Sequence, residues 1–189
     1  MRNITVQPVT TDDAQALLDI YAPYVRETAV TFEYDVPSLS EFEDRIRNIS
    51  TILPYIKAVD ENEKILGYAY AGKFKARRAY DWSVEVTVYV RRDNRGKGIG
   101  CMLYKALEKS LAEIGILNMN ACIAVPKSVD EHLTDASRLF HEQMGFEPVG
   151  TFHNSGYKFN TWYDMIWMEK MIGEHRAEQA EVTFGKWKL

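Results

Sequence analysis

The chain has 189 residues, of which 46% are hydrophobic and 12% aromatic, so it can form one globular domain with a sizeable core. A formal net charge of −4 gives a nucleic-acid partner no general electrostatic attraction. No apolar stretch approaches membrane-spanning length, and the N-terminal residues lack the apolar segment of a signal peptide. Cys101 and Cys122 are far apart in sequence, which argues against a disulfide framework. We therefore expect a cytoplasmic protein with no nucleic-acid or membrane partner.

The first fifty residues predict one strand and two helices. Residues 4–9 alternate weakly between polar and apolar side chains, as a strand does. Two threonines followed by two aspartates are typical of a helix start, which we place at Thr10. Pro23 is expected to bend or end this helix. The segment Ser40–Glu43 fits a capping box that opens a second helix, expected to reach about Ile49.

The rest of the chain predicts six strands and two helices, followed by a polar tail. The strands are expected at residues 54–60, 64–74, 83–90, 119–125, 146–157 and 162–171. The helices are expected at residues 99–114 and from Thr134 or Asp135 to Met144, each stopped by a glycine. This order predicts a mixed α/β sheet without the regular alternation of a doubly wound fold. Residues 1–172 would form the domain and residues 173–189 a C-terminal tail, either docked or mobile.

The most informative stretch is the strand, turn and helix of residues 83–108. Along the strand four valines point one way, while Glu85, Thr87 and Tyr89 point the other. The turn combines two cations with three glycines, and its members are Arg95, Gly96, Lys97, Gly98, Ile99 and Gly100. A helix N-terminus offers unpaired N–H groups and a partial positive charge, and glycines let a ligand oxygen approach the backbone. The stretch therefore predicts a site for a pyrophosphate.

The spacing of the glycines limits the nucleotide class. A P-loop requires a Lys-Ser or Lys-Thr pair after its last glycine, whereas here Cys101 follows and no such pair exists. A dinucleotide-binding fold requires G-x-G-x-x-G, normally at its first strand–helix turn, whereas this turn has G-x-G-x-G after the fourth expected strand. A tight turn without any ligand is the structural alternative.

The pattern R-x-x-G-x-G, at Arg95, Gly98 and Gly100, resembles that of the GNAT superfamily of acyl-CoA transferases. Further segments resemble the phosphinothricin N-acetyltransferase branch of this superfamily. These segments are Tyr80–Glu85, Val88–Val90, Leu139–Phe146 and Gly156–Lys158, together with Trp162 and Asp164. The resemblance covers about residues 12–169. It implies the GNAT fold, an α/β fold with a mixed, mostly antiparallel central sheet flanked by helices.

The resemblance also implies acetyl-CoA as co-substrate. The CoA pyrophosphate would lie on the turn Arg95–Gly100, and the backbone of Thr87, Val88 and Tyr89 would pair with the pantetheine arm. Thr134 stands near the place where the superfamily often has an asparagine that contacts CoA, but a longer loop precedes it, which leaves the inherited specificity open. The four histidines show no zinc-ligand spacing, so no metal is expected.

Two residues match positions with chemical roles in the phosphinothricin branch. Glu85 matches the glutamate assigned there as general base, and an attacking amine, which arrives mostly protonated, needs such a group to accept a proton. His141 matches a histidine that would protonate the CoA thiolate or orient the substrate. The alternatives are a solvated strand carboxylate and a helix-surface histidine without a chemical task. Cys101 is interpreted as a small helix residue, because the resemblance implies direct transfer without an acyl-enzyme.

Four residues match acceptor-binding positions of the same branch. Lys75, Arg77 and Tyr80 would bind the acid groups of the substrate, since charge-assisted hydrogen bonds orient a carboxylate or phosphinate. Phe32 would line the amino-acid side. The alternative for residues 73–78 is an ordinary basic surface loop.

The expected function is transfer of acetyl from acetyl-CoA to the α-amino group of a small amino acid, such as phosphinothricin, methionine sulfoximine or methionine sulfone. One alternative is another amine, namely a peptide N-terminus, a polyamine or an aminoglycoside, although the cations of the basic loop would repel the last two. The other is a non-catalytic acyl-CoA-binding module. Relatives in this branch are commonly homodimers, and the aromatic strands of residues 146–171 are the candidate interface.

Overall fold

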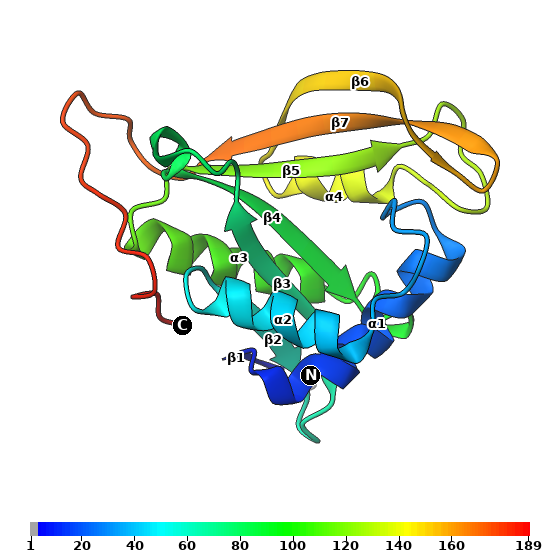
Figure 1. Cartoon of the computed structure of the whole chain (residues 1–189), viewed down its shortest axis with the longest axis horizontal. Coiled ribbons are helices and arrows are strands. Elements are labelled where there is room, and N and C mark those ends of the chain that lie inside the picture. Colours follow the sequence, from blue (N-terminus) through cyan, green and yellow to red (C-terminus); the bar gives the residue numbers. More distant parts are fainter. Residues whose placement is uncertain (1–3) are drawn as a thin grey trace.

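The computed structural model describes residues 4–189, whose seven strands form one sheet in the order β1-β2-β3-β4-β5-β7-β6 (Figure 1). The strands are β1 (Thr5–Pro8), β2 (Tyr55–Val59), β3 (Ile65–Lys73), β4 (Ser83–Val90), β5 (Asn118–Val125), β6 (Glu147–Lys158) and β7 (Thr161–Met171). The helices are α1 (Ala14–Glu27), α2 (Leu39–Ser50), α3 (Ile99–Glu113) and α4 (Ala136–Gln143). Neighbouring strands are antiparallel except for β4 and β5, which are parallel. The predicted order of elements and the mixed, mostly antiparallel sheet are confirmed.

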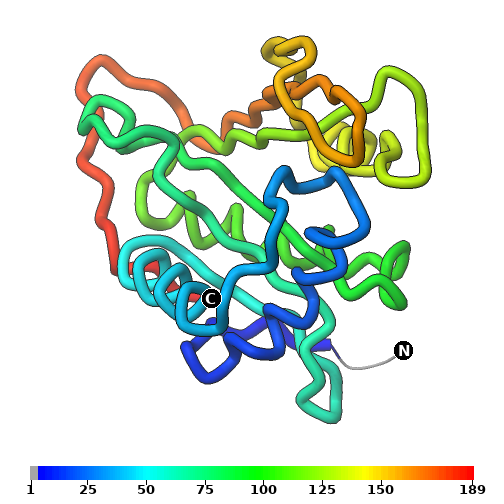
Figure 2. The backbone as a smooth tube through the Cα atoms, turned by 45° about the vertical axis from the view of Figure 1, so that its right-hand side comes forward, coloured from blue at the N-terminus to red at the C-terminus, as the bar shows by residue number. Residues whose placement is uncertain are grey.

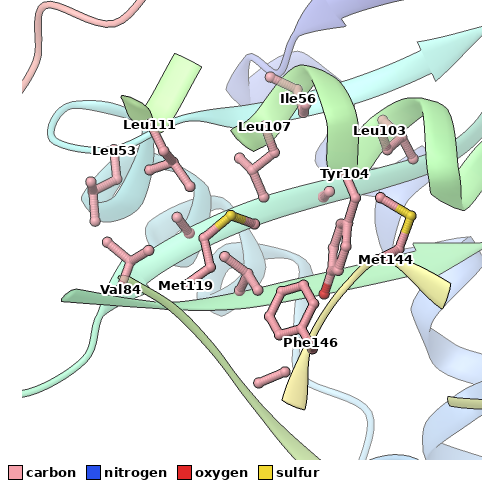
Figure 3. Packing of buried hydrophobic residues seen from close by; sticks show 14 of the residues in the cluster. Leu53, Ile56, Val84, Leu103, Tyr104, Leu107, Leu111, Met119, Met144 and Phe146 are labelled. Carbon is pink, nitrogen blue, oxygen red and sulfur yellow. The ribbon is translucent and has the colours of Figure 1, made fainter. Parts of the chain in front are cut away.

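The alternation along β4 divides its side chains between the two faces of the sheet. Val84 and Val86 belong to the core that α3 covers, where Leu103, Leu107 and Leu111 of α3 pack on the sheet (Figure 3). The opposite face of the sheet is covered by α1 and α2 and carries a second core rich in tyrosines. Because successive side chains of a strand point to opposite faces, Glu85 lies on the α1 and α2 side, as the valine pattern predicted.

The starts and ends of the first two helices differ from the sequence-based prediction. A capping box joins Thr10 to Asp13 through a single 3-10 turn, after which α1 runs past Pro23 to Glu27, so the helix does not end at the proline. The residues that follow Pro23 are buried against the sheet, and this packing outweighs the one helical hydrogen bond that a proline lacks. The cap of α2 is Ser38 and not Ser40, because the Ser38 hydroxyl accepts the backbone N–H three residues later.

The two parallel strands at the middle of the sheet separate after three residues. Ser83–Glu85 of β4 pair with Asn118–Asn120 of β5. Beyond them β4 stays paired with β3, and β5 with β7, so that the two halves of the sheet diverge (Figure 1). This divergence exposes one edge of β4 from Val86 onward, and Glu85 stands where it begins.

The C-terminal segment is a docked arm, which settles the choice that the sequence left open. It returns along the end of α3 toward α2 (Figure 2). The N–H of Thr183 donates to Ile114 at 2.9 Å, and that of Gly185 donates to Ile52 at 2.8 Å. Phe184 and Trp187 pack against the core on the α3 side. Within residues 4–189, no helix combines the length and apolar character that crossing a bilayer requires.

Candidate active site

A cavity of about 470 Å³ lies where β4 and β5 separate, and it continues beneath α2. At one end it is lined by Tyr104 of α3 and His141 of α4. Its middle is lined by Glu85 and the following residues of β4. At the other end it meets Glu33 and Arg45, from the α1–α2 loop and from α2. A volume of this size suits a small organic ligand together with the tip of a second one.

Glu85 is partly withdrawn from water at the point where the strands part. Burial raises the pKa of its carboxyl group above the usual value, because the charged form loses hydration, and the nearby Lys75 cation lowers that pKa in part. The alternative of an ordinary solvated carboxylate does not fit this environment. Cys122 of β5 also lines the cavity, with its side chain exposed to solvent.

His141 is 5% exposed, which contradicts the alternative of a helix-surface histidine. Its Nδ1 lies 2.7 Å from the Ser137 carbonyl oxygen, and its Nε2 lies 3.0 Å from the Tyr104 hydroxyl. A carbonyl can only accept, so Nδ1 carries the hydrogen, and in the neutral ring Nε2 accepts the Tyr104 O–H. Burial lowers the pKa of His141, and the bond to Ser137 offsets this in part. The neutral ring is therefore favoured.

The edge of β4 that faces the cavity belongs to the three residues predicted to hold the pantetheine arm. Thr87, Val88 and Tyr89 pair with β3 on one side, while β5 has already turned away on the other. The ring of Tyr89 packs edge-on against Tyr21 and Tyr24 of α1 at 4.9 and 5.0 Å, which fixes the strand against the helix. A strand edge of this kind can take an extended ligand through main-chain hydrogen bonds.

The glycine turn begins α3 close to that edge. Gly96 and Gly98 have φ angles of 73° and 79°, in the left-handed region that favours glycine. Arg95 lies over the ring of Tyr24, and its Nε donates to the Tyr24 hydroxyl at 3.2 Å. The ammonium of Lys97 folds back and donates to a backbone carbonyl at 2.6 Å. The turn thus presents two cations and the N-terminus of a 15-residue helix, an arrangement suited to an anion.

The last two residues of the predicted turn serve packing. A Cβ at Gly100 would lie 3.2 Å from the ring of Phe140 in α4, so the glycine sets how closely α3 and α4 approach. Ile99 is 2% exposed and belongs to the core. Since Phe140 precedes His141, the spacing at Gly100 also governs the position of the histidine relative to Tyr104.

The predicted acceptor residues are distributed over two places. Phe32 lines the cavity, with its ring packed on Gly156, where any Cβ would clash. The Lys75 ammonium lies over the rings of Phe74 and Trp167 at 4.9 and 5.7 Å, near enough to Glu85 to affect its pKa. Arg77 and Tyr80 are exposed on the same loop, and neither is among the described residues that line the cavity.

The loop before α4 is held by one carboxylate. Asp130 accepts the backbone N–H groups of His132 and Leu133 at 2.8 and 2.7 Å, and the Tyr163 hydroxyl at 2.8 Å. Thr134 is exposed near the start of α4, and its hydroxyl accepts a backbone N–H two residues later at 3.3 Å. The hydroxyl is thus used locally, and Thr134 is not among the described residues that line the cavity.

Sequence reasoning missed several residues that line the cavity, above all Tyr104, Tyr70, Glu33 and Arg45. Tyr104 lies on the apolar stripe of α3, one helical turn after Gly100, and that spacing was a usable signal. The other three had no such signal, because only the tertiary structure brings them to the cavity. Within residues 4–189, no group of three or more His, Cys, Asp or Glu side chains is placed to hold a metal ion.

Comparisons with known proteins agree with this geometry. The acetyltransferase (GNAT) domain family matches residues 6–167. A phosphinothricin N-acetyltransferase of Streptomyces viridochromogenes is 34% identical over 164 residues, which cover 87% of this chain and 85% of that protein. An L-methionine sulfoximine/L-methionine sulfone acetyltransferase of Pseudomonas aeruginosa is 32% identical over 169 residues, which cover 87% of this chain and 92% of that protein.

Solved structures show the same relationship. A GNAT superfamily phosphinothricin acetyltransferase from Sinorhizobium meliloti, in complex with AcCoA, matches with a TM-score of 0.86 and 30% identity, over 97% of each chain. An N-acetyltransferase from Staphylococcus aureus matches with a TM-score of 0.79 and 28% identity, over 90% of this chain and 99% of that one. The chain belongs to the GNAT acetyltransferase family and is an acetyl-CoA-dependent N-acyltransferase.

Proposed function

We propose that the chain transfers the acetyl group of acetyl-CoA to the α-amino group of a small amino acid. The observation that carries this proposal is Glu85, a carboxylate with a raised pKa beside the free edge of β4. The relatives named for phosphinothricin and for methionine sulfoximine or sulfone support an amino acid as acceptor. Lys75, which lies near enough to Glu85 to affect its pKa, would attract the carboxylate of such a substrate, with Arg77 and Tyr80 farther out on the same exposed loop.

In the proposed reaction Glu85 accepts a proton from the substrate ammonium, directly or through one water molecule. The free amine attacks the thioester carbonyl carbon, and a backbone N–H of residues 87–89 stabilises the charge that develops on its oxygen. The amine nitrogen then gives its second proton to solvent water, the carbon–sulfur bond breaks, and CoA leaves as a thiolate. The raised pKa of Glu85 makes its carboxylate a stronger base than an exposed one.

The thiolate needs a proton, and we propose that Tyr104 and His141 supply it as a pair. In the neutral ring Nε2 carries no hydrogen, so His141 alone has nothing to donate there. When the His141 ring takes up a proton from solvent, it donates Nε2–H to the Tyr104 oxygen while the Tyr104 hydroxyl gives its own hydrogen to the sulfur, and the ring returns to its neutral form. His141 acts through Tyr104 in this relay.

An amine panel with acetyl-CoA tests the proposed acceptor, with release of free CoA thiol as the signal. Turnover of small amino acids, and little turnover of polyamines or aminoglycosides, is the expected result. Strong activity on polyamines without any on amino acids would overturn the acceptor class. Binding of acetyl-CoA without thiol release over the whole panel would instead indicate a non-catalytic binding module.

We also propose that the chain forms a homodimer through β6 and β7. These strands expose large apolar side chains, including Val149, Phe152 and Trp162, which are 60%, 58% and 54% exposed. Large apolar side chains that stay exposed on neighbouring strands are candidates for a protein contact. The mass in dilute solution, measured by light scattering, tests this: a dimer that becomes a monomer in the Phe152→Ser/Trp162→Ser variant is expected, and a monomeric native chain contradicts it.

A further inference from the structure

The loop between α1 and α2 forms one wall of the cavity, although it has no regular secondary structure. Four successive residues of this loop line the cavity, namely Val30, Thr31, Phe32 and Glu33. A segment of this kind keeps one conformation only if other parts of the chain bind its backbone, because its N–H and C=O groups have no helix or strand partners. The contacts that hold the loop therefore decide the shape of this wall.

Lys158, the last residue of β6, is buried beneath this loop and is 3% exposed. Its ammonium donates to the carbonyl oxygen of Val25 at 2.7 Å, and to those of Thr28 and Thr31 at 2.9 Å each. An ammonium has three N–H groups, so every donor of Lys158 is used on the end of α1 and on the loop that follows it. In Figure 1 the turn between β6 and β7 accordingly lies beside the C-terminal end of α1.

The two residues before Lys158 hold the loop farther along. The ring of Phe32 packs on Gly156 so closely that no Cβ would fit there. The hydroxyl of Tyr34 donates to the carbonyl oxygen of Tyr157. Together with the ammonium, these contacts attach both the start and the end of the loop to one strand. The wall that Phe32 forms is thus placed by the end of β6.

Packing alone gives no reason for a lysine at this position. Removal of water disfavours an ammonium, and a methionine of similar length would fill the same space without that cost. The lysine adds direction instead, because three backbone carbonyls must converge on one nitrogen atom. This convergence selects a single conformation for residues 28–31, directly before Phe32.

We propose that Lys158 is a positioning residue for the acceptor: it fixes the loop of residues 28–34 and thereby places Phe32 against the bound amino acid. The inference rests on the proposed function, because it takes the wall at Phe32 as the acceptor side of the cavity. Lys158 is not among the described residues that line the cavity, so it acts through the loop. Binding of acetyl-CoA is independent of it, since the proposed CoA contacts lie on the β4 edge and the glycine turn.

Lys158→Met removes all three donors and keeps the length of the side chain. Binding of the acceptor must then also order the loop, so the KM for the acceptor should rise by about 10-fold. We expect kcat to stay within about threefold of native and the KM for acetyl-CoA within about twofold. Thiol release is measured with phosphinothricin or methionine sulfone, whichever the native chain turns over. Lys158→Gln keeps two N–H donors and should raise the acceptor KM by only about threefold, and it carries the same test should Lys158→Met fail to fold.

The control variant is Lys170→Met on the neighbouring strand β7. The Lys170 ammonium is also partly buried, donates to Glu108 at 2.6 Å and does not line the cavity. This variant should keep the native KM for both substrates, and thermal unfolding would show whether each variant retains the fold. A native acceptor KM in folded Lys158→Met overturns the inference, as does an equal rise in the KM for both substrates.

A double-mutant cycle tests whether the effect passes through Phe32. Phe32→Ala removes the ring and should itself raise the acceptor KM. If Lys158 acts by placing that ring, Lys158→Met should raise the KM by less than about twofold in the Phe32→Ala background, compared with about 10-fold in the native one. Equal fold-changes in both backgrounds would show that the lysine acts by another route and would overturn the inference.

Amide hydrogen exchange separates this inference from the proposed function. The N–H groups of Ala29 and Val30 are hydrogen-bonded in the native loop, to the carbonyl oxygen of His132 and to Thr28 Oγ1. In Lys158→Met they should exchange about 10-fold faster, while the amides of α3 keep native rates. If no amino acid is turned over, the proposed function fails and exchange alone decides: faster exchange in the loop supports the role of Lys158, and native rates overturn it. If amino acids are turned over but the acceptor KM of Lys158→Met is native, the proposed function stands and the inference is overturned.

Discussion

Both ends of the reaction site lose water, Glu85 in part and His141 almost completely, and this has opposite effects on their titratable groups. Burial raises the pKa of Glu85 and lowers the pKa of His141. The cause is the same in both, since removal of water disfavours the charged form of each group. For a carboxylic acid the charged form is the base, whereas for a histidine it is the acid.

We call Glu85 and its surroundings the acceptor end of the site, and Tyr104 with His141 the donor end. Burial therefore affects the proposed proton transfers at these two ends differently. At Glu85, a higher pKa strengthens the carboxylate as a proton acceptor. At His141, a lower pKa keeps the ring neutral, so the histidine binds the Tyr104 hydroxyl and holds no proton to give from Nε2. A buried carboxylate thus serves its proposed role directly, while the buried histidine needs a partner.

The largest effect is expected when the acceptor end loses its base. Glu85→Gln keeps the size of the side chain but cannot accept a proton, so kcat at neutral pH should fall by about 10²–10⁴-fold. Binding of acetyl-CoA, measured by calorimetry, should stay close to native, because the proposed CoA contacts lie on the β4 edge and the glycine turn. Glu147→Gln, at an exposed position of β6, is the control. Native turnover in Glu85→Gln would remove Glu85 from the mechanism.

A smaller effect is expected at the donor end. Tyr104→Phe removes the hydroxyl that links His141 to the cavity, and we expect kcat to fall by about 10–100-fold, less than a full general-acid contribution. The affinity for the amino acid should stay unchanged, because Tyr104 lies at the other end of the cavity. Tyr163→Phe, which also loses a buried phenol contact but does not line the cavity, is the control. An unaltered kcat in Tyr104→Phe would exclude the relay.

The sequence predicted single positions at both ends of the site, Glu85 and His141, but not the contacts around them, because local patterns carry the former and tertiary structure the latter. Alternation along residues 83–90 was enough to place Glu85 on the correct face of its strand. The contact between Tyr104 and His141 joins residues 37 apart in sequence, and it depends on how closely α3 and α4 approach. Likewise the sequence shows Arg45 only as one charge on an amphipathic helix, and no local pattern predicts its ion pair with Glu33.

The dependence on tertiary contacts also explains the smaller differences between the predicted and the observed elements. The capping box of α2 begins at Ser38, where Ser38 and Glu41 bond each other's backbone N–H groups, whereas the residue pattern at Ser40 is equally compatible with a cap and so does not distinguish the two. Pro23 is tolerated inside α1 because the residues after it are buried in the tyrosine-rich core. The docking of the C-terminal arm rests on backbone hydrogen bonds to residues far away in sequence, such as Ile52, which no local pattern specifies.

The dependence of kcat on pH tests the acceptor end separately, because the Lys75 cation near Glu85 can be removed by substitution. The Lys75 charge lowers the pKa of Glu85, so Lys75→Met should raise that pKa. The active carboxylate then appears at higher pH, and the acid limb of kcat against pH should move upward at a saturating concentration of acceptor. Because Lys75 is exposed, the shift should shrink at high salt. A limb that stays in place would show that Glu85 is not the group that titrates.

The smallest expected effect tests the spacing of the donor end alone. Gly100→Ala puts a Cβ 3.2 Å from the Phe140 ring, so α4 must shift by a few tenths of an ångström and carry His141 with it. Alanine is favoured over glycine inside a helix by about 1 kcal/mol, which roughly offsets a mild steric clash in the free energy of unfolding. Stability should therefore change little, whereas kcat should fall by about 2–5-fold as the contact from Tyr104 to His141 lengthens.

Gly150→Ala is the control for this variant, because a Cβ at Gly150 would meet no other atom within 4 Å. If Gly100→Ala instead lowered stability and left kcat unchanged, the close approach of α3 and α4 would serve the core and not the donor end. Thermal unfolding and kcat, measured on the same preparation of Gly100→Ala, therefore decide whether this spacing serves the stability of the core or the donor end. The geometry of the Tyr104–His141 contact favours the donor end, since Phe140 and His141 are adjacent on the short helix α4.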